Sequence, residues 1–170
     1  MLKPLLRILV AIVILSFNHG STGYGARLDE EKVVKTVDTY DFILYYECRG
    51  GPNNKNLTAY WDHKGYSIGC GTPSFKGETI TEKEALRRFY EYTNKRVALV
   101  KRDFPKANKN QQTALVSLAG NNGTCYKYFQ KYGIQRSTWL KCDKVRKDGK
   151  LVALRGLTER RKDEVNLYFK

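Results

Sequence analysis

The stretch of residues 47–72 constrains the fold of this chain more than any other. It begins with an acid, Glu47, and continues in a loop rich in glycine, proline and asparagine, where each residue favours a turn. An apolar alternation then leads to a second acid, Asp62, and a glycine-punctuated strand carrying Ser67 closes the stretch. We therefore expect a small β-hairpin, with one carboxyl group before it and another at its tip.

The strands of this hairpin are expected over residues 57–61 and 66–70, joined by a turn in which Gly65 can take a positive φ. Two carboxyl groups flanking such a hairpin fit the hydrolysis of a glycosidic bond, where one acid protonates the leaving oxygen and the other activates water or attacks the sugar. The alternative is that both are ordinary surface carboxylates, which are common. His63 is interpreted as a solvated turn residue beside Asp62.

Helical patterns surround this hairpin. Asp29 is a suitable N-cap for a helix over residues 30–46, which would place Glu47 at its carboxyl end. A capping box at residues 81–84 opens a long helix that is expected to end at Asp103. A helix of about 20 residues spans about 30 Å, which is long enough to join two lobes.

The remainder of the chain is predicted to be helical as well. In the last helix Thr158 is expected to be the cap, with Val165, Leu167 and Phe169 available for packing and a polar side facing outward. The outward residues would be Arg160, Arg161 and Glu164, and the other expected helices cover residues 110–119, 126–132 and 137–147. The predicted class is therefore α+β and mainly α, with a small β-hairpin lobe and a larger helical lobe joined by a long helix.

The charge of the chain indicates which classes of molecule it can bind. Its 170 residues fit one domain, and 31 Lys and Arg against 17 Asp and Glu give a formal net charge of +14. Such a field speeds encounters with polyanions, which include nucleic acid, anionic lipid and the bacterial cell wall. Because the sequence has no recognised nucleic-acid-binding motif, the anionic wall is the preferred partner and no nucleic acid is expected.

The N-terminus predicts export. Lys3 and Arg7 precede the uncharged residues 8–17, a length typical of a secretory signal and short of the roughly 20 residues that span a membrane. Residues 1–25 are therefore interpreted as a signal peptide, the alternative being an uncleaved signal anchor and membrane contact through that leader alone. The protein is expected to act in the periplasm or outside the cell.

The cysteines fit that compartment. All four lie beyond the leader, an even number that predicts two disulfides in an oxidising environment, with three possible pairings and free buried thiols as the alternative. They are Cys48, Cys70, Cys125 and Cys142. With two histidines in the chain and no C-x-x-C pair, neither a metal site nor a cofactor is expected.

Three blocks of sequence resemble the phage-type lysozymes, or endolysins, of glycoside hydrolase family 24. The residues L-T-A-Y-W-D-H-K-G-Y-S-I-G-C-G-T after Glu47 resemble the family's L-x-A-Y-x-D, glycine turn and T-I-G-Y-G-H. Residues 111–123 resemble its N-Q-x-x-A-L-V-S-F-A-x-N-x-G helix, and residues 156–161 resemble its G-L-x-x-R-R motif. The blocks follow the family's order and cover most of the chain from Tyr40 onwards.

This resemblance implies a lysozyme-like fold for residues 26–170 and a monomeric muramidase. Such an enzyme cleaves the β-1,4 link between N-acetylmuramic acid and N-acetylglucosamine in peptidoglycan, with inversion favoured and transglycosylation left open. The catalytic acid would be Glu47, the second carboxylate Asp62 and the catalytic hydroxyl Ser67, where the family has threonine. Arg160 would pair with the acid, with Arg161 as the neighbouring candidate.

The chain also departs from the family pattern. The spacing from Glu47 to Asp62 is longer, with residues 53–56 resembling an inserted loop, whereas the turn before Ser67 is one residue shorter. Thr72 stands where the family has histidine. None of these departures removes a group that the chemistry needs. The alternative function is that of a catalytically weak, basic protein that uses its charge of +14 to bind walls or disrupt membranes.

Within this arrangement the cysteines receive a predicted pairing. A Cys48–Cys70 bridge would tie together the two halves of the site, because Cys48 follows the acid and Cys70 lies on the strand expected to run beside that helix end. A Cys125–Cys142 bridge would then staple the helical lobe.

Overall fold

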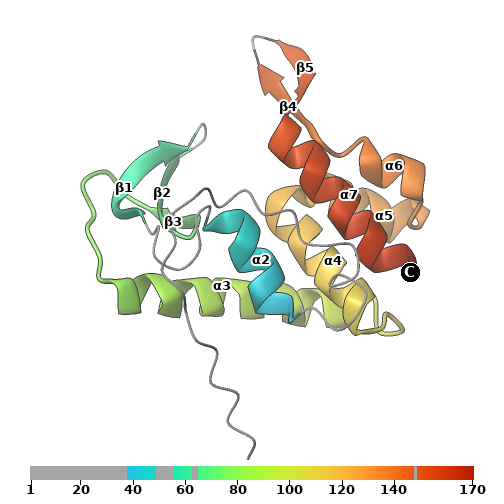
Figure 1. The fold of residues 1–170 in the computed structure, drawn as a ribbon, viewed down its shortest axis with the longest axis horizontal. Helices are drawn as coiled ribbons and strands as arrows, with labels where there is room; N and C mark the ends of the chain where they lie inside the picture. Colours follow the sequence, from blue (N-terminus) through green and yellow to red (C-terminus); the bar gives the residue numbers. More distant parts are fainter. Residues whose placement is uncertain (1–37, 49–55, 63–64, 148) are drawn as a thin grey trace, which may run out of the picture.

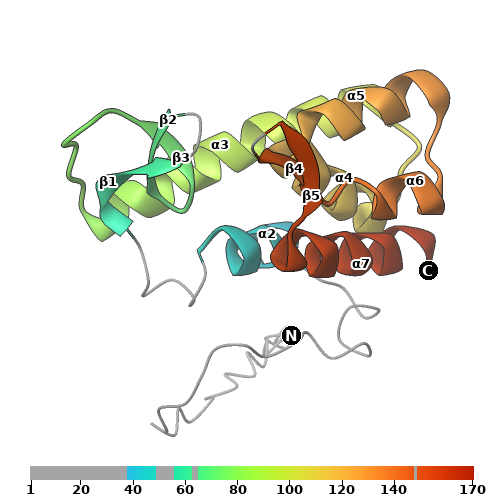
Figure 2. The same cartoon turned by 90° about the horizontal axis from the view of Figure 1, so that it is seen from above.

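The structure, a computed structural model, describes residues 38–48, 56–62, 65–147 and 149–170. The predicted leader, most of the loop after Glu47, and His63 lie outside the described residues. Within the described part, a small β lobe sits at one end of a long helix and the other helices gather at its far end (Figure 1 and Figure 2). This two-lobed arrangement confirms the predicted α+β class.

The helix that carries Glu47 begins later than predicted. α2 covers Thr39–Glu47, and its N-cap is Asp38, whose side chain accepts hydrogen bonds from the backbone N–H groups of Tyr40 and Asp41. Asp38 has an extended backbone with ψ of 135°, so the predicted start after Asp29 is wrong for this helix. The predicted end is confirmed, since Glu47 is its last residue.

The β lobe is an antiparallel sheet in the order β1-β2-β3. Its strands are β1 Asn56–Asp62, β2 Gly65–Gly69 and β3 Thr72–Ser74. The predicted hairpin is confirmed, with Asp62 opposite Gly65 at its tip and Tyr60 opposite Ser67. The third strand was not predicted.

The long helix α3 covers Glu82–Asp103 and passes from the β lobe to the helical lobe (Figure 2). Thr81 caps it as predicted by accepting from the backbone N–H of Glu84. Two arginines, Arg87 and Arg88, hydrogen-bond the Glu84 carboxylate and lower its pKa to about 2.

Four further helices and a second hairpin complete the part of the chain that the structure describes. They are α4 Lys109–Asn121, α5 Gly123–Tyr132, α6 Arg136–Leu140, β4 Lys144–Lys147 and β5 Lys150–Ala153, followed by α7 Arg155–Phe169. A reciprocal capping box between Asn108 and Gln111 opens α4. The core lies among these helices, with Leu115, Trp139 and Leu167 buried in it.

The predicted helix over residues 137–147 is wrong in its second half. Helix α6 ends at Leu140, and the chain enters a hairpin in which Val145 pairs with Val152. β-branched residues favour strands, and Gly149 supplies the positive φ of 77° that the tight connection requires. The hairpin projects from the helical lobe (Figure 1).

The last helix also differs from its prediction. α7 begins at Arg155, and the Thr158 hydroxyl hydrogen-bonds Asp143 instead of capping the helix. Arg160, Arg161 and Glu164 are buried and do not face outward, because they pair with one another inside the lobe. The prediction used helical periodicity alone and therefore placed these three charged residues on the wrong side of the helix.

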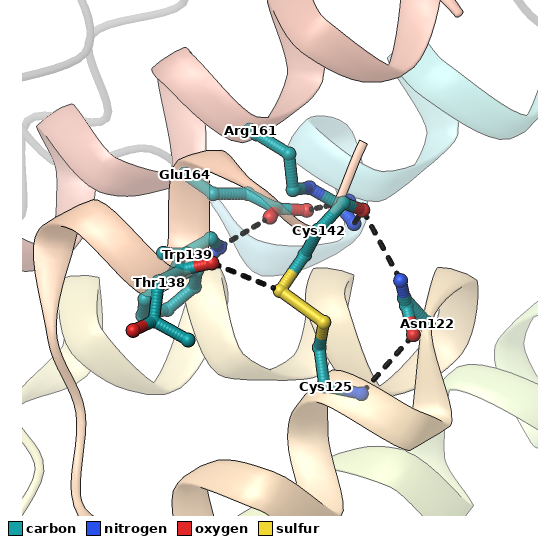
Figure 3. Close-up of a disulfide and its surroundings, with 7 residues drawn as sticks. All are labelled: Asn122, Cys125, Thr138, Trp139, Cys142, Arg161 and Glu164. Atoms are coloured by element: carbon teal, nitrogen blue, oxygen red, sulfur yellow. Dashed lines mark hydrogen bonds and ion pairs between the residues drawn. A yellow bond between two sulfur atoms is a disulfide. The ribbon is translucent and has the colours of Figure 1, made fainter. Parts of the chain in front are cut away.

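Both predicted disulfides are present. Cys48 is bonded to Cys70 between α2 and the end of β2, and Cys125 is bonded to Cys142 between α5 and the segment after α6. Figure 3 shows the second bridge beside the buried residues Trp139 and Glu164.

Gly69 is a position where the fold requires glycine. Its φ is +60°, and a Cβ atom there would lie 3.0 Å from the Cβ of Ala85 on α3. We expect Gly69→Ala to lower the free energy of unfolding by roughly 2–3 kcal/mol, from backbone strain together with steric overlap. Denaturant unfolding under oxidising conditions measures this loss.

Gly77→Ala is the matched control, because Gly77 has a φ of +83° but open space around it. It should lose only the strain contribution, on the order of 1 kcal/mol. Equal losses in the two variants would show that the contact between β2 and α3 is not tight.

Candidate active site

Glu47 lies where α2, the β lobe and α7 meet. Its carboxylate accepts a hydrogen bond of 2.8 Å from Nη1 of Arg160, and its side chain keeps 24% of its surface exposed. Gly71 lets the chain after β2 pass close by, since a Cβ atom at that position would lie 3.2 Å from Oε2 of Glu47. The carboxyl group is thus held on one side and open to solvent on another.

Arg160 is itself held by several bonds. Its Nε donates to the Ser117 hydroxyl at 3.0 Å and to Oε1 of Glu164 at 3.3 Å, and its Nη2 donates to the Ser117 carbonyl at 3.3 Å. The guanidinium also lies 5.0 Å from the centre of the Tyr46 ring. A buried arginine fixed in this way leaves one N–H group aimed at Glu47.

Of the two arginines considered in sequence, Arg160 is the one that contacts Glu47. Arg161 points instead to Glu164, because its Nη2 donates to Oε1 of Glu164 at 2.6 Å. Its Nη1 donates to the carbonyl of Cys142 at 3.5 Å (Figure 3).

Asp62, Ser67 and Tyr60 share one face of the β sheet. Tyr60 and Ser67 are direct cross-strand partners, and Asp62 lies two residues after Tyr60 on the same strand. Asp62 is exposed and Ser67 is half-buried.

Tyr60 was not selected from the sequence, although its spacing from Asp62 was a usable signal. Burial raises the pKa of its hydroxyl, as do the negative charges of Asp62 and Glu47, while a hydrogen bond with Asn56 lowers it. The hydroxyl is therefore within electrostatic reach of both carboxylates.

Arg96 is a second cation near Glu47 that the sequence did not single out. Its guanidinium stacks over the Tyr92 ring at 3.7 Å, and Nη2 donates to the Gly120 carbonyl at 3.3 Å. Burial lowers its pKa, and the charge of Glu47 is among the influences that raise it. A Cβ atom at Gly120 would lie 2.8 Å from Nη1 of Arg96, so the arginine occupies space that this glycine leaves free.

Thr72, which replaces the family's histidine, is buried and donates to the carbonyl of Ile68 at 3.0 Å. It therefore supports the turn after β2.

The described residues contain no group of three or more His, Cys, Asp or Glu side chains placed to hold a metal ion. Over the same residues, no helix combines the length and apolar character needed to cross a membrane.

The family model described as phage lysozyme matches residues 53–164, which is well over half of the chain. The chain belongs to the phage lysozyme family. The matched range contains Asp62, Ser67 and Arg160, whereas Glu47 lies just before it. No relative matched in a search of the curated proteins.

Solved structures of two phage endolysins and of a muramidase domain are similar to this fold. The endolysin of Escherichia coli O157:H7 phage FAHEc1 is 27% identical with a TM-score of 0.60, over 76% of this chain and 89% of that one. The muramidase domain of SpmX from Asticaccaulis excentricus is 19% identical with a TM-score of 0.62, over 78% and 95%. The active form of the P1 phage endolysin Lyz is 20% identical with a TM-score of 0.54, over 80% and 85%.

Membership of the phage lysozyme family confirms the resemblance seen in the sequence and supports a peptidoglycan hydrolase function.

Arg160 should matter for stability as well as for the site. We expect Arg160→Met to lower the free energy of unfolding by about 3–5 kcal/mol, because it removes one partner of a buried charged network. Arg155→Met, on the same helix, removes the exposed pair with Glu159 and should leave stability nearly unchanged. Similar unfolding midpoints for these two variants would contradict the description of the buried network.

Proposed function

We propose that this phage lysozyme family member is a muramidase that cleaves the β-1,4 link between N-acetylmuramic acid and N-acetylglucosamine, with Glu47 as the general acid. The observation that carries the proposal is the placement of Glu47. Glu47 is held by Arg160 and partly exposed, and it lies within electrostatic reach of Tyr60, the cross-strand partner of Ser67.

In this mechanism the protonated Glu47 donates its proton to the glycosidic oxygen as the bond to the sugar carbon breaks. Asp62, ionised and exposed at the hairpin tip, accepts a proton from the attacking water, and Ser67 orients that water. Arg160 stabilises the carboxylate that Glu47 becomes. The sugar keeps the hydroxyl of the water, and the leaving sugar keeps the proton from Glu47.

The proposed stereochemical outcome is inversion. In an inverting enzyme the two carboxyl groups stand roughly 6.5–9.5 Å apart to admit a water molecule between acid and base. Glu47 and Asp62 come from separate elements, α2 and the tip of the β1–β2 hairpin, which suits an arrangement with water between them.

Delivery to the wall relies on charge and export. The formal charge of +14 draws the enzyme to the anionic wall, and we propose that residues 1–25 direct it out of the cytoplasm, where it acts as a monomer.

The first test is the clearing of purified cell walls by Glu47→Gln. We expect at least about a 1000-fold loss of rate with unchanged thermal unfolding, because the amide cannot donate the required proton. Glu91→Gln, on the exposed side of α3, is the matched control and should keep full activity.

This test also separates the muramidase from a basic protein that disrupts walls or membranes through charge alone. Undiminished lysis by Glu47→Gln would favour the charge-driven function and reject Glu47 as the acid.

The second test identifies the products. Digestion of purified peptidoglycan should release reducing N-acetylmuramic acid ends that form first as the α-anomer, because inversion converts the β-link. Early nuclear magnetic resonance spectra and mass analysis measure this. Initial β-anomers would show retention, and anhydro ends would show transglycosylation.

A further inference from the structure

We propose that the buried Glu164 is a positioning residue for the reaction, which holds Arg160 against Glu47 and sets the net charge that Glu47 faces. This inference rests on the proposed role of Glu47 as the general acid. It concerns a residue three helical positions beyond Arg161 that touches neither Glu47 nor the sheet face in the described contacts.

The contacts of Glu164 are unusually complete for a carboxylate with no exposed surface. Its Oε1 accepts from the Ser117 hydroxyl at 2.6 Å, from Arg161 Nη2 at 2.6 Å and from Arg160 Nε at 3.3 Å. Its Oε2 accepts from the indole N–H of Trp139 at 2.8 Å. Helices α4, α6 and α7 therefore converge on one carboxylate.

The surroundings prevent this group from moving. The carbonyl of Cys142 accepts from Arg161 at 3.5 Å and from the amide of Asn122 at 3.1 Å, and Cys142 is bonded to Cys125 (Figure 3). Trp139, which is fully buried, packs between Phe129 and Tyr168. Because every partner of Glu164 is fixed, its position fixes the guanidinium of Arg160.

The cluster around Glu164 contains two positive charges and one negative charge. Two buried arginines share Glu164, and Arg160 alone continues to Glu47. Without the negative charge of Glu164, the pair of cations would favour the ionised form of Glu47 more strongly. Glu164 thus offsets one of the two cations on the side of Glu47 that faces α7.

Other groups also face these carboxylates, and the proposed variants leave them in place. The Tyr46 hydroxyl hydrogen-bonds Asp163, and burial together with that bond raises the pKa of Tyr46, so this residue stays neutral. Among the described residues, the charged or titratable groups that pair with or electrostatically influence Glu47 include Arg160, Arg96 and Tyr60, and those around Glu164 include Arg160, Arg161 and Tyr46.

The test is a charge-swap series read out by the pH dependence of kcat/KM on soluble peptidoglycan fragments at constant ionic strength. A general acid must be protonated, so activity falls as the pH rises through its pKa, and a lower pKa moves this alkaline limb to lower pH. Glu164→Gln keeps the shape and removes the negative charge, so the limb should move down by on the order of one pH unit.

Arg161→Gln removes a cation and should move the limb in the opposite direction. The double variant Glu164→Gln/Arg161→Gln should return the limb toward that of the unmodified protein. Glu159→Gln, which changes an exposed acid on the same helix, should not move it. A loosened structure cannot produce two shifts of opposite sign, so this pattern is specific to charge.

Two results would overturn the proposal. One is an alkaline limb that stays at the same pH in both single variants while only the stability or the maximal rate falls. A residue with a purely structural role would behave in this way. The other is a shift in the same direction for both. If Glu164→Gln does not fold, the Arg161→Gln variant decides alone. An alkaline limb at higher pH supports the proposal, and a limb that does not move overturns it. Retained activity in Glu47→Gln is a separate outcome and would reject the acid itself.

Discussion

The ion pair between Arg160 and Glu47 is the interaction on which the rest of this structure depends. It joins the end of α2 to α7, two helices separated by more than a hundred residues of sequence. Arg160 can serve this purpose because Ser117 and Glu164 occupy its remaining donors inside the helical lobe. A catalytic carboxyl group needs both a fixed position and access to substrate. The ion pair fixes the position of Glu47 and leaves part of its side chain exposed.

The β lobe meets this fixed point through separate connections. The Cys48–Cys70 bridge ties the residue after Glu47 to the end of β2. The close contact of Gly69 with Ala85 packs the same strand against α3. As a result, the sheet face with Asp62 is tied to the acid by covalent and packing contacts that do not depend on the hairpin tip.

Much of this could be predicted from the sequence where a signal was local. The hairpin, the long helix and the end of α2 followed from turn residues and caps, whereas the pairing of the cysteines followed from the arrangement that the family resemblance implied. The hairpin of β4 and β5 was missed because helical periodicity in a short basic segment is ambiguous. The burial of Arg161 and Glu164 was missed for a different reason. Arg161 and Glu164 pair with each other within α7, but Glu164 also depends on hydrogen-bond donors from other helices, Ser117 and Trp139. Periodicity carries no information about such partners. Arg96 gave no signal at all, since one arginine in a basic helix looks like any other.

The arrangement of Arg96 over Gly120 has an evolutionary consequence. The guanidinium lies where the side chain of residue 120 would be, so the two positions divide a single volume between them. In related sequences a larger residue at position 120 should therefore appear together with a shorter one at position 96. A designer who wishes to move a cation away from the acid could exchange the pair as a unit, filling the volume from α4 in place of α3.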